Sequence, residues 1–344
     1  MNLTNGTYLN GGTYKIIRQI SSGGFGITYE AEHIMLHKRV AIKEFFVNDF
    51  CNRDETTSHV TVGTQNKIGL VMKLKKKFVD EAAAISQLDH PNIVKVSDVF
   101  EDNGTAYYVM NYIDGLSLNE IIKRDTKMPE QKVLKYILQI ADALKYVHAN
   151  NRFHLDIKPG NIMVDDKDNA ILIDFGASKQ YDEESGENTS TLLGKTPGYA
   201  SIEQMGNCVQ VFTPATDIYA LGATPYKLVT GVAPPEATSL ASGETLPTIT
   251  DNISIDMKTA IVQSMQLNKA KRPQSIDAFV SLLKADKRSK YSNTSGSLKN
   301  KNNEQKNDSI QEEETLLDLN HAPQRPKSVS PKYSPKGLHE KKRI

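Results

Sequence analysis

One stretch of sequence constrains this chain more than any other: a polar loop over residues 154–161, HLDIKPGN, is followed by the triplet DFG that starts at Asp174. Between them lie two short apolar runs that predict strands. A single loop aspartate is most often a turn or cap residue, but the joint spacing of Asp156, Asn161 and Asp174 argues against that interpretation. Asp156 is a candidate for orienting or deprotonating a hydroxyl, and the other two offer the oxygen ligands that Mg²⁺ prefers. The pattern predicts phosphoryl transfer, in which the protein mainly positions groups and neutralises charge.

Charge is unevenly distributed along the 344 residues, although the net charge is only +1. From Ala285 onward there are 13 Lys and Arg against 8 Asp and Glu, whereas the preceding residues carry 29 against 33. This balance gives no strong signal for nucleic-acid binding.

Cysteine content and hydropathy indicate the compartment. The two cysteines, Cys51 and Cys208, cannot build a disulfide framework, which favours a reducing environment. No apolar stretch approaches the roughly 20 residues needed to span a bilayer, and the first residues lack the features of a secretory signal. We therefore expect a cytoplasmic protein without a transmembrane segment.

Hydrophobic periodicity predicts a strand-rich first part. Strands are expected at Tyr14–Ile20, Ile27–His33, Arg39–Phe45, Val96–Glu101 and Ala106–Asn111. Side-chain alternation puts Ala41 and Lys43 on one face of the third strand. A helix at about Lys73–Leu88 carries Glu81 on its apolar face. An acid in that position needs a cationic partner, and Lys43 is the candidate.

The pattern turns helical after Asp114-Gly115. Helices are expected around the apolar face that runs from Val133 to Val147, and at Ala215–Thr230, Ile255–Met265 and Ser275–Lys284. From about residue 287 the composition shifts to Ser, Asn, Lys, Glu and Gln, which is too polar to form a core of its own.

Together these motifs resemble the protein kinase family, and most closely the bacterial serine/threonine kinases of the eukaryotic type. The resemblance covers about residues 14–284. It implies an α+β, bilobal fold with a small β-rich N-lobe (about 14–112) and a larger helical C-lobe (about 113–284), and leaves 285–344 as a disordered, polar and basic tail. The implied activity is transfer of the γ-phosphate of ATP to protein Ser/Thr hydroxyls, with ATP and Mg²⁺ as cofactors. The implied partners are protein substrates, with no nucleic acid, and the partner of the tail is unknown.

The resemblance also implies roles for single residues. Asp156 is the catalytic-loop aspartate. Lys158, which separates Ser/Thr kinases from Tyr kinases, reaches both the γ-phosphate and that carboxylate. Lys43 binds the α- and β-phosphates, and Glu81 holds Lys43 in place.

The other implied residues form the ATP site, the metal site, the substrate-docking segment and the scaffold. A glycine-rich loop, the adenine pocket and the hinge contribute Ile20, Ser21, Ser22, Gly23, Gly24, Phe25, Gly26, Ile27, Thr28, Ala41, Lys43, Met110, Tyr112 and Met163. The metal ligands are Asn161 and Asp174, the docking residue is Thr196, and the structural residues are Glu203, Arg272 and Asp217. A glycine-rich loop alone is a weak signal. Here a strand and then a lysine follow it, whereas a helix follows a dinucleotide-binding fingerprint.

Several positions depart from the family pattern. Leu155 stands where the usual H-R-D motif has an arginine that pairs with an activation-loop phosphate. We therefore predict weak dependence on phosphorylation of that loop. Its candidate sites are Thr189, Ser190, Thr191 and Thr196. Ser21 replaces the first loop glycine, Ser201-Ile202-Glu203 replaces A-P-E, and Thr28 replaces a valine that packs on adenine. The unusually long connection between Lys43 and Glu81, at about 46–70, is compatible with a decorated loop or a small hairpin.

Two alternative functions stay open. A pseudokinase that binds nucleotide and acts as a scaffold is favoured when Lys43, Asp156 or Asp174 is missing, and all three are present. A small-molecule kinase of related fold usually lacks the segment from DFG to GKTPGY, which in this chain ends at Tyr199.

Overall fold

The structure is a computed structural model that describes residues 2–24, 26–175, 179–180, 196–205, 212–249 and 253–284. The chain divides into two units, 1–295 and 296–344, and every described residue belongs to the first. The predicted tail over 285–344, the loop residue Phe25 and the candidate phosphorylation sites Thr189, Ser190 and Thr191 lie outside the described residues.

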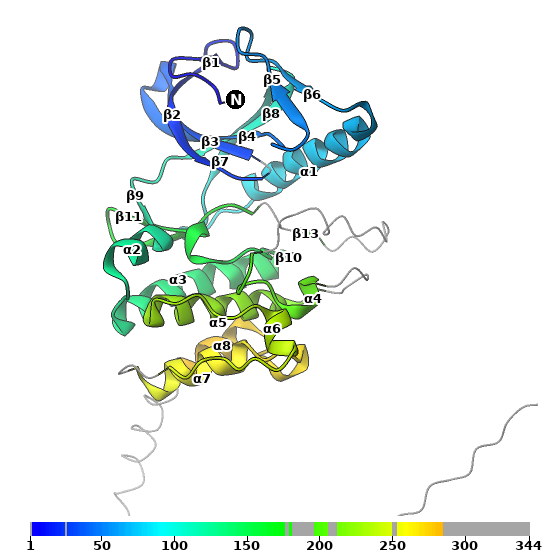
Figure 1. The fold of residues 1–344 in the computed structure, drawn as a ribbon. Coiled ribbons are helices and arrows are strands. Elements are labelled where there is room, and N and C mark those ends of the chain that lie inside the picture. Colours follow the sequence, from blue (N-terminus) through cyan, green and yellow to red (C-terminus); the bar gives the residue numbers. More distant parts are fainter. Residues whose placement is uncertain are drawn as a thin grey trace, which may run out of the picture. The chain divides into compact units, whose positions relative to one another are not determined.

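The N-lobe, residues 2–112, is built on a six-stranded antiparallel sheet in the order β1-β2-β3-β4-β8-β7 (Figure 1). Its strands are β1 (Tyr8–Leu9), β2 (Tyr14–Ser22), β3 (Gly26–His33), β4 (Lys38–Phe45), β7 (Val96–Asp102) and β8 (Thr105–Asn111). Strand β8 is buried from Thr105 to Met110, because both faces of the sheet are covered at this point.

Helix α1 (Ile68–Ser86) packs across one face of this sheet, against β7 and β8. Its buried side chains recur at helical spacing, and Phe78 contacts the rings of Phe45 and Tyr108. Helix α1 begins five residues before the predicted start and ends two residues before the predicted end.

The unusually long connection before α1 contains a short antiparallel hairpin of β5 (Cys51–Arg53) and β6 (Val60–Val62). It lies against the sheet face opposite Lys43. There the carboxylate of Glu44 accepts hydrogen bonds from Arg53 (2.6 Å), Tyr29 (2.9 Å) and Tyr107 (2.6 Å). Arg53 and Glu44 are 3% and 0% exposed, so a buried ion pair anchors the hairpin to the N-lobe.

The C-lobe, residues 113–284 where described, is mainly helical (Figure 1). Its helices are α2 (Leu118–Asp125), α3 (Glu130–Ala149), α4 (Ile202–Met205), α5 (Pro214–Thr230), α6 (Ala237–Ala241), α7 (Ile255–Ser264) and α8 (Ile276–Leu282). Its strands are β9 (Gly115–Ser117), β10 (Arg152–Phe153), β11 (Ile162–Asp165), β12 (Ala170–Leu172) and β13 (Lys179–Gln180). Strands β12, β11 and β9 form one small sheet, and β10 pairs with β13.

Helix α5 is the centre of the C-lobe, since it is buried along almost its whole length and contacts α3, α7 and α8. Its C-terminal end is capped by Gly231, which has φ 78°. A side chain there would approach the Thr126 carbonyl oxygen to 2.6 Å, so glycine is required. This packing fixes the start of α5, where Asp217 lies, relative to the loop that follows β10.

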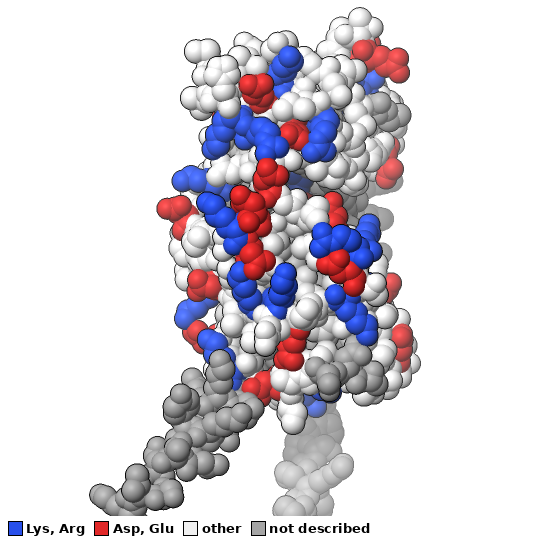
Figure 2. All heavy atoms as spheres, turned by 90° about the vertical axis from the view of Figure 1, so that its left-hand side faces the viewer, with Lys and Arg blue, Asp and Glu red and all other residues white. Residues whose placement is uncertain are grey.

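No helix within the described ranges is both long enough and apolar enough to cross a membrane. Figure 2 shows one face of the molecule, on which Lys and Arg alternate with Asp and Glu from the N-lobe to the C-lobe. Among the described residues on this face, neither sign forms a continuous patch.

Candidate active site

The loop between β10 and β11 brings three predicted residues together, because two of them donate hydrogen bonds to the carboxylate of the third. Lys158 Nζ donates to Asp156 Oδ2 at 2.7 Å, and Asn161 Nδ2 donates to the same oxygen at 2.9 Å. Asn161 also donates to the Asp156 carbonyl oxygen at 2.8 Å, which fixes the turn between the two residues. The Asp156 side chain remains 18% exposed, so its position is fixed by donors but still open to a substrate.

Thr196, which follows Asp156 by 40 positions in the sequence, completes this cluster. Its hydroxyl donates to Asp156 Oδ1 at 2.7 Å and accepts from Lys158 Nζ at 2.9 Å. Asp156, Lys158 and Thr196 therefore form a closed triangle of hydrogen bonds. Thr196, which is predicted to lie beside the substrate hydroxyl, therefore contacts Asp156, which is predicted to orient that hydroxyl.

The backbone of the loop is held from behind by Asp217. Its Oδ1 accepts from the Leu155 amide at 2.8 Å, and its Oδ2 accepts from the His154 amide at 2.9 Å and from His148 Nε2 at 2.8 Å. Burial alone would raise the pKa of Asp217, but the hydrogen bond from His148 and the interactions with His148 and His154 hold that pKa below its usual value. An ionised, fully buried aspartate is the natural acceptor for two adjacent backbone N–H groups.

Asp174 follows β12 in the left-handed conformation, with φ 57°. The Ile173 amide donates to the Asn161 carbonyl oxygen at 2.9 Å, which keeps the two predicted metal ligands on adjacent segments. Lys43 of β4 forms an ion pair with Asp174 across the gap between the lobes. Burial would lower the Lys43 pKa, yet Asp174, Tyr108 and Glu81 outweigh it and the pKa lies above its usual value.

Glu81 of α1 lies near this pair, but among the described residues no ion pair joins it to Lys43, whose partner is Asp174. Burial raises the pKa of the Glu81 carboxyl to about 8. The attraction of Lys43 opposes this rise and the repulsion of Asp174 adds to it. The predicted contact between Lys43 and Glu81 is therefore an electrostatic one at longer range in this structure.

The glycine-rich loop joins β2 to β3. The Gly23 amide donates to the Gly26 carbonyl oxygen at 2.9 Å, and Ser21 and Ser22 belong to the end of β2. A side chain at Gly26 would approach the Glu44 carbonyl oxygen to 2.7 Å and the Lys43 side chain to 3.5 Å. Gly26 thus lets β3 approach β4 beside Lys43.

The predicted adenine-pocket residues come from both lobes. Thr28 is paired with Lys43, and Ala41 with Met110, so these four positions lie on one face of three neighbouring strands. Ile27, by contrast, is 1% exposed in the core, and strand alternation puts it on the face opposite Thr28. The remaining predicted positions are Ile20, which is exposed at the end of β2, Tyr112 in the hinge and Met163 on β11.

Two further predicted residues form a buried ion pair below the site. Arg272 donates to Glu203 through two nitrogens at 2.7 and 3.0 Å, and to the backbone oxygens of Ala215, Gln266 and Leu267. Burial would raise the pKa of Glu203, but Arg272 lowers it below its usual value. The pair joins α4 to the start of α5.

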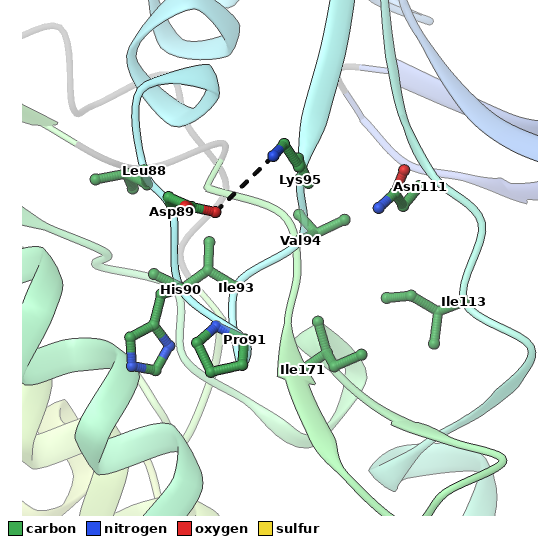
Figure 3. A pocket seen from close by; sticks show the side chains of 10 residues that line it. All are labelled: Leu88, Asp89, His90, Pro91, Ile93, Val94, Lys95, Asn111, Ile113 and Ile171. Atoms are coloured by element: carbon green, nitrogen blue, oxygen red, sulfur yellow. Dashed lines mark ion pairs between the residues drawn. The ribbon is translucent and has the colours of Figure 1, made fainter.

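A separate pocket of about 420 Å³ lies beside the hinge, where Asn111 and Ile113 line it (Figure 3). Its apolar lining comes from the segment Leu88–Val94, from Ile113 and from Ile171, and Lys95 forms an ion pair with Asp89 at its edge, 3.9 Å apart. None of the predicted catalytic side chains lines this pocket.

Three contacts near the site were not predicted from the sequence. Gln204 Nε2 donates to the Leu155 carbonyl oxygen at 2.8 Å, Asn48 Nδ2 donates to the Gly23 carbonyl oxygen at 3.1 Å, and Arg53 binds Glu44. Each joins residues at least nine positions apart, so local periodicity carries no signal for them. The proximity of Gln204 to Glu203 in a recognised motif was the one available hint.

A strand-rich lobe that carries a lysine and a glycine-rich loop, facing a helical lobe that carries an Asp-Lys-Asn loop, is the arrangement typical of ATP-dependent phosphotransferases. Comparison with known proteins narrows this class. The family model described as "Protein kinase domain" matches residues 14–302. The chain belongs to the protein kinase family, and the predicted family and bilobal α+β fold are confirmed.

Individual relatives point the same way. The chain is 34% identical to serine/threonine-protein kinase PrkC of Bacillus subtilis over 67% of this chain and 32% of that protein. It is 31% identical to serine/threonine-protein kinase PknA of Mycobacterium tuberculosis over 65% of this chain and 48% of that protein. A solved structure, PpkA-294 in its apo form, is 26% identical with a TM-score of 0.72, over 82% of this chain and 99% of the other. The chain spans about a third of the length of the first curated relatives it matches.

Proposed function

We propose that this protein is a serine/threonine kinase that transfers the γ-phosphate of ATP to Ser or Thr hydroxyls of protein substrates. One observation carries the proposal: Asp156, Lys158 and Thr196 form a closed triangle of hydrogen bonds. The names of the relatives support the serine/threonine class.

In this mechanism the substrate hydroxyl approaches Asp156 beside Thr196. Asp156 accepts a hydrogen bond from the hydroxyl, which turns the oxygen lone pair toward the γ-phosphorus. It takes the proton as the new O–P bond forms and as the bond from the γ-phosphorus to the β,γ-bridging oxygen breaks, so that ADP leaves with that oxygen. Lys158 offsets the negative charge that develops on the transferred group. Lys43 binds the α- and β-phosphates, while Gly23 and Gly26 let backbone N–H groups approach them closely.

The oxygen-bearing side chains of Asn161 and Asp174 fit a hard divalent cation, and we propose Mg²⁺. This ion is usually held by one or two carboxylates and by substrate phosphates, which matches a site with two protein ligands. When bound, the cation would neutralise negative charge on the phosphates. The hydrogen bond from the Ile173 amide to Asn161 supports the proposal, because it keeps the two ligands on neighbouring segments.

The proposal also states which residues form the kinase domain and in which cell compartment it acts. We assign the kinase domain to about residues 14–284, in keeping with a family match over 14–302. We place the activity in the cytoplasm, where ATP is abundant and a buried free thiol such as Cys51 stays reduced. The tail beyond residue 284 is left without an assigned partner.

Phosphate transfer from labelled ATP tests this proposal. Wild type with Mg²⁺ is expected to label Ser and Thr of itself and of a generic basic protein, and Asp156→Asn is expected to abolish labelling. Asp277→Asn is the matched control. Asp277 forms an exposed surface pair with Lys145, so this variant is expected to retain full activity. Nucleotide binding without transfer would favour the pseudokinase. Transfer only to small alcohols would favour the small-molecule kinase.

A further inference from the structure

Gln204 of α4 joins two segments that both border the proposed catalytic centre. Its side-chain nitrogen donates to the Leu155 carbonyl oxygen at 2.8 Å. Its side-chain oxygen accepts from the Ser201 amide at 3.0 Å and from the Ser201 hydroxyl at 3.1 Å. One amide group therefore holds both the segment that follows Thr196 and the loop that carries Asp156.

The residue that Gln204 holds has an unusual backbone. Leu155 has φ 64°, a left-handed conformation that is uncommon for a residue with a bulky side chain and that needs support from its surroundings. Asp217 binds its N–H group and Gln204 binds its carbonyl group, so both polar backbone groups of Leu155 are fixed. Asp156 is the next residue, and its orientation depends on this peptide.

Leu155 itself carries no charge that could hold the segment 196–205. Its side chain is 8% exposed and apolar, at the position where the family pattern has an arginine that pairs with a phosphate. In this chain the hydrogen bond from Gln204 to Leu155 connects the same two segments, and this connection needs no phosphate.

We propose that Gln204 is a positioning residue: it couples the segment 196–205 to the catalytic loop through Leu155 and so aligns Asp156 without a phosphate. This inference rests on the proposed kinase activity for its kinetic consequences. The coupling itself is a property of the backbone and can be measured separately.

The simpler alternative is that Gln204 only caps the first turn of α4. Gln204→Glu separates the two roles, because a carboxylate still accepts from the Ser201 amide and hydroxyl but cannot donate to the Leu155 carbonyl oxygen. The matched control is Gln266→Glu. The side chain of Gln266 likewise donates to a backbone oxygen, that of Val262 at 3.1 Å, on an exposed part of the C-lobe.

The kinetic test uses the full chain after phosphatase treatment. We expect Gln204→Glu to lower kcat about tenfold, with KM for ATP within about twofold of wild type and an unchanged melting temperature, since loss of one aligning bond acts on the chemical step. Gln266→Glu is expected to keep wild-type kinetics. Wild-type kcat in Gln204→Glu would overturn the proposal. The proposal would also be overturned if kcat fell together with equally large losses in ATP affinity and in melting temperature.

Amide hydrogen exchange tests the coupling without relying on activity. In Gln204→Glu we expect faster exchange in the catalytic loop, 153–158, and unchanged exchange in α3. Unchanged exchange in the loop would overturn the coupling. If wild type transfers no phosphate, the proposed function fails, while the exchange experiment still decides whether Gln204 holds the loop.

Discussion

At the scale of single residues, the Asp156 carboxylate is shared among three donors, and Thr196 is the one that comes from outside the catalytic loop. Thr196→Val keeps the shape of the side chain but removes the hydroxyl. Hydrogen bonds to charged groups contribute about 1.5–3 kcal/mol, so we expect kcat to fall roughly 10- to 100-fold. Thr196→Ser, which retains the hydroxyl, should stay within a few-fold of wild type. Steady-state kinetics check this, and equal rates for the two variants would contradict it.

The carboxyl of Glu81 gives a pH dependence at the same scale. Its pKa is raised to about 8 in the folded protein, chiefly by burial, from an ordinary value near 4.5. Between these values the folded state binds a proton that the unfolded state has lost, so the Glu81 contribution to stability falls as pH rises through this window and is level above it.

Glu81→Gln removes that titration. We therefore expect the stability of wild type, relative to this variant and without nucleotide, to decrease progressively from about pH 5 to about pH 8. Urea unfolding at several pH values measures the difference. A constant difference across the range would show that Glu81 ionises normally in the folded state.

At the scale of elements, the hairpin of β5 and β6 is attached to the N-lobe by a buried charge pair. Arg53→Met leaves the Glu44 carboxylate at 0% exposure without its cation. Removing one partner of a buried ion pair costs about 3–5 kcal/mol of stability. We therefore expect the unfolding free energy of Arg53→Met to be lower than that of wild type by this amount. Arg124→Met, which breaks an exposed pair with Asp125, should change it by less than about 1 kcal/mol.

A second substitution sharpens this test. Glu44→Gln in the Arg53→Met background removes the unpaired charge but keeps an acceptor for the hydroxyls of Tyr29 and Tyr107. Stability should then recover by at least about half of the loss. No recovery would mean that Arg53 acts through its other contacts, such as the Ser58 carbonyl oxygen and the Phe46 ring, rather than through its pair with Glu44.

Elements with a strong hydrophobic period were predictable from the sequence, and the others were not. The strand predicted at Arg39–Phe45 is β4, and the helix predicted at Ala215–Thr230 is α5, each with one end displaced by a residue. Helix α1 starts earlier than predicted because Gly69 weakens the helical signal in its first turn, where tertiary packing of Val71 and Leu74 decides the outcome. The hairpin of β5 and β6 has strands of only three residues, too short for a period to be recognised.

The same distinction applies to the candidate site. The sequence predicted Asp156, Lys158 and Asn161 because they stand at short, recognisable spacing within one loop. It predicted Asp174 because that residue follows directly after an expected strand. The bonds of Gln204 to Leu155 and of Arg53 to Glu44 depend on how distant segments are packed, and no local pattern encodes them. The partner of Lys43 shows the limit clearly: helix periodicity pointed to Glu81, whereas the structure pairs Lys43 with Asp174.

At the scale of the whole molecule, the proposed nucleotide site takes its groups from both lobes, and the pair of Lys43 with Asp174 already crosses between them. A ligand that binds only the folded state stabilises it by about 2.7 kcal/mol at 100 times its Kd. For a domain of this size we therefore expect Mg·ATP to raise the melting temperature by roughly 5–10 °C. Because Mg²⁺ is proposed to bind between the phosphates and Asp174, ATP with a chelator should produce a much smaller rise.

Variants of the two lobes decide whether the nucleotide joins them. Lys43→Met should lose most of the Mg·ATP-dependent rise, since the N-lobe then lacks its phosphate-binding cation. Lys145→Met is the matched control, because Lys145 forms an exposed pair with Asp277 on the outside of the C-lobe. Its melting temperature should respond to Mg·ATP as wild type does. A full response of Lys43→Met would place the nucleotide in one lobe only, and an undiminished rise with the chelator would remove the metal from the proposed site.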